Sequence, residues 1–276
     1  MNAYLLAVLI GIVEGITEFL PVSSTGHMLV FEQMLGLSLD EDPFWRLFTI
    51  VIQLGAILAV VLLYGRTLTR FVTGLFTRGG IAEKLRHPLI LVGLAFVPSA
   101  IAGVTLKKQI DALMEHAMPI GLALILGAIA IEVIERFTKD RAHTPVIDDT
   151  TPTQALGIGV AQVVSLVPGV SRSGATIMGG LLGGLSRTAA TDFSFLLSIP
   201  TMFAAAGYSL LKHRVPLTGE QWSVLAVGFV TAALTAGLVV AWFLRHVKTH
   251  TFRLFVVYRV IAGAAICAAA ATGHLH

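Results

Sequence analysis

Six apolar stretches, each about twenty residues long, constrain the fold of this chain more than any other feature. A helix rises 1.5 Å per residue, so about twenty apolar residues cross the roughly 30 Å hydrocarbon core of a bilayer. The chain is 55% hydrophobic and only 13% charged, whereas soluble domains carry roughly 25% charged residues. We therefore expect an all-α integral membrane protein with six spanning helices. The expected spans are about 44–64, 88–106, 117–137, 189–211, 222–244 and 252–271.

Two further apolar regions, about 3–38 and 154–185, are broken near their middles by a proline and small polar residues. The first break reads Pro21-Val-Ser-Ser-Thr-Gly, and the second reads Pro168-Gly-Val-Ser-Arg-Ser-Gly. Each half is too short to span a bilayer. Non-helical backbone at membrane depth is tolerated only inside protein or against a water-filled cavity. We therefore expect two re-entrant helix–turn–helix pairs.

The two broken regions indicate an internal repeat, because the similarity continues into the next apolar stretch as Phe48-Thr-Ile-Val-Ile and Phe193-Ser-Phe-Leu-Leu. The repeats would cover about 1–138 and about 150–276 within one polytopic domain, 1–276. Each half would contain one re-entrant pair and three spans, and an odd number of crossings inverts the second half relative to the first. The two polar turns would then enter from opposite faces and meet near the midplane.

The basic residues favour one orientation, because most of them fall in connections on a single predicted side. Cytoplasmic loops are enriched in Lys and Arg, so this side is predicted to be cytoplasmic. Asp40, Glu41 and Asp42, together with both termini, would lie outside. The formal charge of +3 is thus explained by the loops, and no nucleic-acid partner is expected. The basic residues are Arg66, Arg70, Arg78, Lys84, Arg86, Lys139, Arg141, Arg187, Arg245, Lys248 and Arg253.

The first polar turn concentrates groups that are expensive to bury in a membrane. Glu14 and Glu18 are four residues apart, which places both carboxyl groups on one face of a helix that ends near Pro21. Hydroxyl groups and the imidazole of His27 follow within a few residues. Ionisable groups at this depth require mutual pairing or a polar ligand. A packed core, in which a base neutralises the two acids and the hydroxyls only cap the next helix, is the alternative; the clustering favours a ligand site.

The second polar turn adds the guanidinium of Arg172 between Ser171 and Ser173, at the predicted start of a helix. Unpaired backbone N–H groups and the helix dipole favour an anion there. The planar fork of an arginine can engage two phosphate oxygens at once. The turn therefore indicates a phosphate site, which Thr176 could extend. Arg172 could instead be, or also be, the internal counter-ion of Glu14 or Glu18.

Other polar residues at membrane depth are expected to be structural. Cys267 should pack between helices. Arg259 lies about seven residues into the last span, so we expect it to snorkel or to pair with Glu132 or Glu135, outside the site. The remaining polar side chains are expected to form hydrogen bonds between helices. They are Gln53, Ser99, Gln162, Ser194, Ser198 and Thr201.

The two motifs, Glu-Gly-x-Thr-Glu-Phe-Leu-Pro-Val-Ser-Ser-Thr-Gly-His and Pro-Gly-x-Ser-Arg-Ser-Gly-Ala-Thr, resemble the signatures of the bacitracin-resistance family of undecaprenyl pyrophosphate phosphatases. The resemblance covers essentially the whole chain in length, repeat and order of segments. It implies a multi-pass enzyme of the bacterial inner membrane that removes one phosphate from a 55-carbon lipid pyrophosphate. The product is the lipid carrier of peptidoglycan synthesis. The resemblance further implies a divalent cation, Mg²⁺ or Ca²⁺, and an active site open to the periplasm.

The resemblance also implies the site residues, position by position. Glu14 and Glu18 correspond to an acidic pair that binds the metal or handles protons. Ser24 is expected to be the nucleophile, assisted by Glu18 or His27, while Arg172 and the cation hold the pyrophosphate. His27 as the nucleophile, through a phosphohistidine, is the competing assignment. The residues expected to bind substrate are Ser23, Thr25, Ser171, Arg172, Ser173 and Thr176.

A secondary transporter or flippase for an anionic lipid or solute is the alternative function, because inverted repeats with broken helices are typical of transporters. The density of hydroxyls, paired acids and His27 at one turn exceeds what an anion site needs, which favours hydrolysis. The expected partners are a prenyl pyrophosphate lipid and the membrane itself. A homodimer is left open by the sequence.

Overall fold

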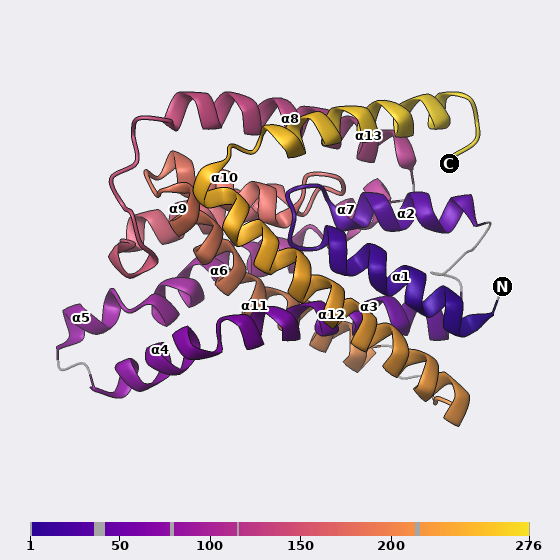
Figure 1. Ribbon diagram of the computed structural model, residues 1–276, viewed down its shortest axis with the longest axis horizontal. Coiled ribbons are helices and arrows are strands. Elements are labelled where there is room, and N and C mark those ends of the chain that lie inside the picture. Colours follow the sequence, from indigo (N-terminus) through magenta and orange to yellow (C-terminus); the bar gives the residue numbers. More distant parts are fainter. Residues whose placement is uncertain (1, 36–41, 78–79, 115, 213–215, 276) are drawn as a thin grey trace.

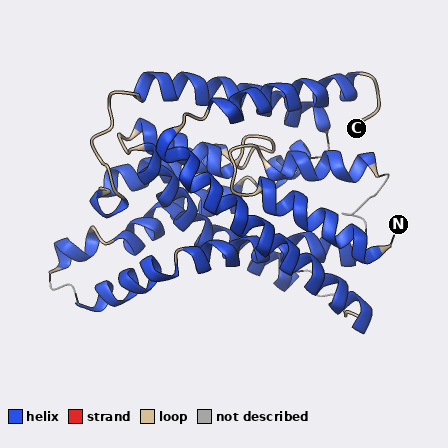
Figure 2. Ribbon diagram, in the orientation of Figure 1, coloured by secondary structure: helices blue, strands red, loops and turns tan. Residues whose placement is uncertain are grey.

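Helices make up nearly all the secondary structure of the described residues, which are 2–35, 42–77, 80–114, 116–212 and 216–275 of the computed structural model (Figure 2). The exception among these residues is one isolated β-bridge between Thr144 and Leu185. The expected all-α class is therefore confirmed. Asp40, Glu41 and Arg78, which entered the orientation argument, lie outside the described residues.

Among the described residues, six helices are long and apolar enough to cross a membrane, which confirms the spans expected from hydropathy. Their ends agree with the expected ends to within a few residues, except that α12 (Gly219–Thr249) continues past the expected end near residue 244. The extra residues include Arg245, His246 and Lys248, which a helix can carry into water beyond the apolar layer. The six are α3 (Pro43–Leu63), α6 (Pro88–Thr105), α8 (Ala117–Thr138), α11 (Arg187–Lys212), α12 (Gly219–Thr249) and α13 (Arg253–Ala271).

The two broken regions each form a pair of short helices, and the two turns meet inside the molecule. The first pair starts at the end of the molecule that holds both chain termini, and the second starts at the opposite end (Figure 1). This is the arrangement expected of two inverted halves. The pairs are α1 (Ala3–Thr17) with α2 (Ser24–Met34), and α9 (Pro152–Val164) with α10 (Arg172–Leu182). The remaining elements are α4 (Gly65–Thr77), α5 (Ile81–Leu85), α7 (Lys107–Met114) and η1 (Ile147–Asp149).

The two turns reach their second helices through the same unusual backbone conformation. Ser23 and Ser171 are the N-caps of α2 and α10, and their φ angles are 69° and 78°. Residues with a Cβ rarely adopt positive φ, and such a conformation persists only where the surroundings enforce it. Each helix that follows has 11 residues. The two breaks therefore share a backbone geometry as well as a sequence pattern.

Small residues let the helices around the turns approach closely. A Cβ added at Gly15 of α1 would lie 2.8 Å from the carbonyl oxygen of Ala232 on α12. A Cβ added at Gly121 of α8 would lie 2.6 Å from the sulfur of Cys267 on α13, which confirms the packing role expected for this cysteine. Such close approach is how helices associate in lipid, where apolar burial alone gives little preference for protein neighbours.

The basic connections gather at the end of the molecule opposite the termini (Figure 1). Arg70 forms an ion pair of 2.9 Å with Asp148, and Arg187 forms one of 3.0 Å with Glu135. A polar cavity at this end is lined by four of the basic residues that predict the cytoplasmic side. They are Lys139, Arg187, Lys248 and Arg253. The structure thus separates a basic end from the end with both termini, as the sequence predicts.

Candidate active site

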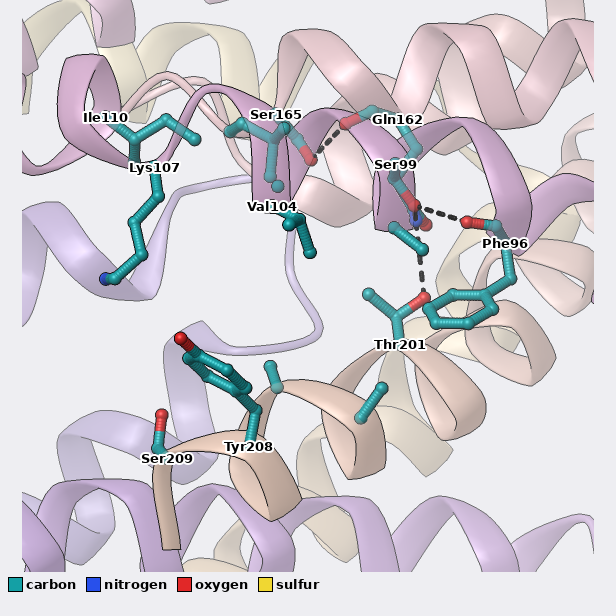
Figure 3. Close-up of a pocket in the computed structure, with 15 residues that line it drawn as sticks. Phe96, Ser99, Val104, Lys107, Ile110, Gln162, Ser165, Thr201, Tyr208 and Ser209 are labelled. Atoms are coloured by element: carbon teal, nitrogen blue, oxygen red, sulfur yellow. Dashed lines mark hydrogen bonds between the residues drawn. The ribbon is translucent and has the colours of Figure 1, made fainter. Parts of the chain in front are cut away.

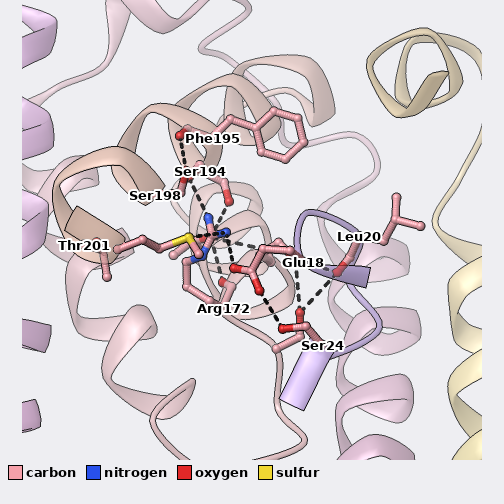
Figure 4. Close-up of polar contacts among 12 residues, drawn as sticks. Glu18, Leu20, Ser24, Arg172, Ser194, Phe195, Ser198 and Thr201 are labelled. Atoms are coloured by element: carbon pink, nitrogen blue, oxygen red, sulfur yellow. Dashed lines mark hydrogen bonds and ion pairs between the residues drawn. The ribbon is translucent and has the colours of Figure 1, made fainter. Parts of the chain in front are cut away.

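The two polar turns contact each other directly, and the contact is ionic and hydrogen-bonded. Nη2 of Arg172, the first residue of α10, lies 3.1 Å from Oε1 of Glu18 at the end of α1 (Figure 4). Ser173 Oγ donates a hydrogen bond of 2.8 Å to the carbonyl oxygen of Leu20. The side chains of Arg172 and Glu18 are only 12% and 9% exposed. The pairing of Arg172 with Glu18, one of the two alternatives left by the sequence, is therefore present.

Glu18 also contacts the hydroxyl of Ser24 with its other carboxylate oxygen. Ser24 Oγ donates to Glu18 Oε2 at 2.6 Å (Figure 4). A short hydrogen bond to a carboxylate is the arrangement in which that carboxylate can take up the proton of a hydroxyl nucleophile. Glu18 therefore connects Ser24, a candidate nucleophile on the first turn, with the guanidinium of Arg172 on the second turn.

Arg172 is held from several sides. Its Nη1 donates to the carbonyl oxygen of Ser194 at 3.3 Å, and its Nη2 lies 3.7 Å from Met202 Sδ. The guanidinium carbon lies 5.4 Å from the centre of the Phe19 ring. A guanidinium has five N–H donors, so these contacts with described residues leave donors for an anionic ligand while fixing the orientation of the group.

A cavity of about 230 Å³ lies between the two turns and α11. Six of the residues expected from the sequence line it, so the structure brings the two motifs to one space. These six are Glu18, Ser23, Ser24, Thr25, Ser171 and Arg172. Gln53 of α3, expected only to form hydrogen bonds between helices, also lines the cavity.

The start of α2 in the first turn lacks a side-chain cap, because its N-cap residue, Ser23, makes none. Thr25 is exposed. The first N–H groups of a helix have no partner within the helix, and they favour an anion. In contrast, Ser171 caps α10, because its Oγ accepts a hydrogen bond of 3.2 Å from the backbone N–H of Gly174.

Ser173 and Thr176, both expected to bind substrate, are fully buried and are absent from the cavity lining. Ser173 bonds to Leu20, as described above, and its Oγ lies 3.0 Å from that of Ser171. Thr176 Oγ1 lies 2.6 Å from Ser194 Oγ and donates to the carbonyl oxygen of Arg172 at 2.9 Å. In this conformation, both hydroxyls hold the second turn in place.

His27 is engaged through both ring nitrogens. Its Nδ1 lies 2.7 Å from the carbonyl oxygen of Ser23, and its Nε2 contacts the hydroxyl of Tyr258 on α13. A carbonyl oxygen only accepts, so Nδ1 carries the proton, and Nε2 of the neutral ring accepts from the Tyr258 hydroxyl. The two rings stack, with centroids 5.5 Å apart. His27 therefore supports the backbone of Ser23, and it is absent from the cavity lining.

Glu14 lies one helical turn before Glu18 and is 1% exposed. Its Oε1 has no hydrogen-bond partner among the described residues. It interacts electrostatically with both Glu18 and Arg172. Two carboxyl groups beside one guanidinium leave room for one more positive charge, and an orphaned carboxylate oxygen is a ligand that Mg²⁺ and Ca²⁺ accept. The residues present thus fit a divalent cation.

The described residues contain no group of three or more His, Cys, Asp or Glu side chains able to hold a metal ion. A cation at Glu14 and Glu18 would therefore need further ligands from substrate and water. Mg²⁺ sites that act on phosphates commonly have one or two carboxylates together with substrate oxygens and waters. The small ligand set is thus consistent with a cation that binds together with substrate.

The expectation for Arg259 is wrong. Arg259 is fully buried rather than snorkelling, and Glu132 and Glu135 pair with Arg136 and Arg187 instead. Its guanidinium donates to the carbonyl oxygens of Pro21 at 3.0 Å, of Val170 at 3.1 Å and of Gly169 at 3.1 Å. It also donates to two carbonyls of α8, those of Ala123 and Leu124. Arg259 thus joins both polar turns to α8.

The position of Arg259 in the sequence indicates only its depth along its own helix, and this depth does not predict its contacts with the two turns. The available signal was the charge itself, since an ionisable residue within a spanning helix indicates a functional site by default. The space that Arg259 fills is created by Gly127 of α8, where an added Cβ would lie 2.0 Å from Nη2.

Several other polar residues have the interhelical role expected of them. Gln162 Nε2 of α9 donates to Ser99 Oγ of α6 at 2.5 Å and to Thr201 Oγ1 of α11 at 3.3 Å. Ser194 joins α11 to α10 through Thr176. Ser198 instead donates to the carbonyl oxygen of Phe195 within its own helix, at 2.6 Å.

Comparison with known proteins gives one consistent result. Residues 7–265 match the family model described as "Bacitracin resistance protein BacA". The chain is 44% identical to the "Undecaprenyl-diphosphatase" of Novosphingobium aromaticivorans, over 96% of this chain and 97% of the relative. It is 42% identical to the protein of the same name from Koribacter versatilis, over 97% and 98% of the two chains. It is also 43% identical to that of Nitrosomonas europaea, over 97% and 94%.

Proposed function

Because the chain belongs to the bacitracin resistance protein BacA family, we propose that it hydrolyses undecaprenyl pyrophosphate to undecaprenyl phosphate and inorganic phosphate. The reaction recycles the lipid carrier of cell-wall synthesis in the bacterial inner membrane. The observation that carries the proposal within this molecule is the contact of Ser24, Glu18 and Arg172 around one cavity. A nucleophile, a base and a phosphate-binding cation are the groups that phosphoryl transfer requires.

In the proposed reaction, Ser24 Oγ attacks the terminal phosphorus while its proton passes to Glu18 Oε2, 2.6 Å away. The bond between the terminal phosphorus and the bridging oxygen breaks, and its electron pair leaves with undecaprenyl phosphate. Water then cleaves the phosphoserine and releases inorganic phosphate, with Glu18 returning the proton to Ser24. The fixed guanidinium of Arg172 stabilises the negative charge on the non-bridging oxygens.

Ser24 is favoured over His27 as the nucleophile on geometric grounds. The Nδ1 of His27 donates to Ser23, and its Nε2 lone pair faces the Tyr258 hydroxyl. An imidazole attacks through an unprotonated nitrogen, so His27 would have to give up the Tyr258 contact before it could react. His27 is better suited to hold Ser23 and Ser24 in position.

Glu14 and Glu18 would hold the divalent cation, Mg²⁺ or Ca²⁺. When bound, such a cation neutralises negative charge on phosphate oxygens. Ser23, Thr25 and Ser171 line the cavity and are positioned to bind phosphate oxygens.

We propose that the cavity opens to the periplasmic side. The basic connections lie at the end of the molecule opposite the chain termini, and basic loops are cytoplasmic, so the end with the termini would face the periplasm. In this orientation we expect the two short helix pairs to be re-entrant and the halves 1–138 and 150–276 to form one inverted-repeat domain.

The proposed function is tested by incubating the purified full-length chain in detergent with undecaprenyl pyrophosphate and Mg²⁺ or Ca²⁺. We expect release of inorganic phosphate and stoichiometric undecaprenyl phosphate. A transporter or flippase would return the substrate intact, and that result would contradict the proposal.

A further inference from the structure

A second and larger cavity adjoins the candidate active site. It has a volume of about 400 Å³ and lies between α6, α7, the end of α9 and α11 (Figure 3). It shares four lining residues with the site cavity, namely Ser165, Leu166, Thr201 and Ala205. We call this second cavity the side groove. Because these four residues belong to both linings, the side groove adjoins the space beside Arg172.

The side groove is mainly apolar, and several of its polar residues are bonded to other protein groups (Figure 3). Lys107, Tyr208 and Ser209 also line it. The amide nitrogen of Gln162 donates to Ser99 and Thr201, as described above. Ser99 Oγ donates to the carbonyl oxygen of Phe96 at 3.0 Å, and Ser165 Oγ donates to that of Gln162 at 2.6 Å. What remains for a ligand is mainly carbon, contributed by Phe96, Val104, Ile110 and Ala204.

The side groove is open toward the surroundings of the protein. Val104 and Tyr208, on its two walls, are 79% and 56% exposed. Both belong to candidate membrane spans, α6 and α11. An open apolar groove on this surface would face lipid chains, so a hydrocarbon chain can enter it sideways without passing through water.

We propose that the side groove binds the isoprene units nearest the pyrophosphate of the prenyl substrate, while the rest of the chain stays in the bilayer. This inference rests on the proposed function. It adds the path that the prenyl chain of the substrate takes out of the active site. A pyrophosphate held at Arg172 must send its hydrocarbon chain out of a cavity of only about 230 Å³, whose lining combines hydroxyls and charges with apolar residues. The side groove is the adjoining apolar space, and its volume falls in the range of small-molecule sites.

The inference predicts how activity depends on chain length. Each buried CH₂ contributes favourable free energy until the groove is filled. We therefore expect kcat/KM to rise from a five-carbon prenyl pyrophosphate to substrates of intermediate length, and then to level off well before 55 carbons.

Two glycines of α6 provide a matched pair of variants. An added Cβ would meet nothing within 4 Å at either Gly103 or Gly93, so both positions accept a side chain. Gly103 lines the side groove, whereas Gly93 does not. Gly103→Phe therefore places a ring in or beside the groove, and Gly93→Phe makes the same change elsewhere on the same helix.

We expect Gly103→Phe to lower kcat/KM for undecaprenyl pyrophosphate by about tenfold or more, the effect of displacing about two CH₂ groups. The same variant should hydrolyse the five-carbon pyrophosphate within about twofold of the wild-type rate, since the short chain gains little from the groove. Gly93→Phe should leave kcat/KM unchanged for both substrates. Equal losses for both substrates, or no loss for the long one, would overturn the inference.

A second readout does not depend on turnover. A farnesyl pyrophosphate that carries a photoreactive group on its chain should label segments 96–110 and 201–209 of the purified protein. Unlabelled farnesyl pyrophosphate should compete, and an excess of phosphatidylglycerol should not. Labelling of other segments, or equal competition by the phospholipid, would contradict the inference. Groove labelling without phosphate release would instead reject the proposed function and leave the groove assignment standing.

Discussion

The two polar turns share a backbone plan but use their side chains differently. Both have an N-cap serine with positive φ, Ser23 and Ser171, followed by a helix of 11 residues. In the second turn, Ser171 caps its helix and Ser173 bonds to Leu20. In the first turn, Ser23 makes no cap, and Ser24 bonds to the carboxylate of Glu18.

The difference indicates that the second turn mainly holds the structure in place, whereas the first turn carries the proposed nucleophile. The hydroxyls of the second turn satisfy its own backbone and bind the first turn, so they fix the direction of Arg172. The first turn instead presents the hydroxyl of Ser24 to the cavity. Ser24 and Arg172 occupy the same place, the first residue of α2 and of α10. The two equivalent positions thus carry the proposed nucleophile in the first turn and a guanidinium in the second.

The largest effect is expected where the second turn meets the phosphate. Arg172→Lys keeps the charge but loses the fork that engages Glu18 and a phosphate oxygen together. Loss of about two charge-assisted hydrogen bonds, at roughly 1.5–3 kcal/mol each, should lower kcat by roughly two to four powers of ten. The assay is phosphate release from undecaprenyl pyrophosphate, with the thermal unfolding midpoint as the control for folding. Near-normal turnover would make Arg172 a structural counter-ion only.

A loss almost as large is expected from the first turn. Ser24→Ala should reduce kcat by at least about a hundredfold at any cation concentration, because a missing nucleophile is not restored by mass action. Glu18→Gln should differ from Ser24→Ala in raising the divalent-cation concentration needed for half-maximal activity, since it removes a proposed ligand of that cation. If Ser24→Ala keeps more than about a tenth of the activity, Ser24 only positions substrate, and acid-quenched trapping should then be used to search for phosphohistidine.

Arg259 should behave differently from Arg172, since it holds the two turns without lining the cavity. Arg259→Lys leaves three donors for five carbonyl acceptors. Unsatisfied buried groups cost about 1–3 kcal/mol each, so we expect the thermal unfolding midpoint and the activity to fall together. An unchanged midpoint with lost activity would place Arg259 among the groups that act on substrate.

The smallest effect distinguishes the two N-cap serines. Glycine adopts positive φ without strain and loses more entropy on folding, and both effects apply equally to Ser23→Gly and Ser171→Gly. Only Ser171→Gly removes a helix cap, and replacing an N-cap serine by glycine costs only a few tenths of a kcal/mol, roughly 0.3. We therefore expect Ser171→Gly to be the less stable variant, with a thermal unfolding midpoint lower by about one degree. Equal midpoints would mean that the Ser171 cap adds nothing to the second turn.

The sequence predicted the architecture well because the bilayer imposes a simple rule on length and hydropathy. The six spans, the two breaks and the meeting of Glu18 with Arg172 all follow from that rule and from the repeat. The roles of Arg259 and Tyr258 do not follow from that rule. Arg259 bonds to backbone carbonyls, and Tyr258 bonds to the ring of His27, which is far away in the sequence. Hydropathy places a residue along its own helix and does not say which turn of another segment lies beside it.

We expect the two turns to act as one catalytic unit, and a double-variant cycle can show whether they do. Phosphate release from undecaprenyl pyrophosphate is measured for wild type, Glu18→Gln, Arg172→Lys and the double variant. Residues in direct contact are coupled by about 0.5–3 kcal/mol, so the double variant should be only slightly slower than the slower single variant. A double variant whose loss equals the product of the two single losses would show that Glu18 and Arg172 act independently, and would contradict the account.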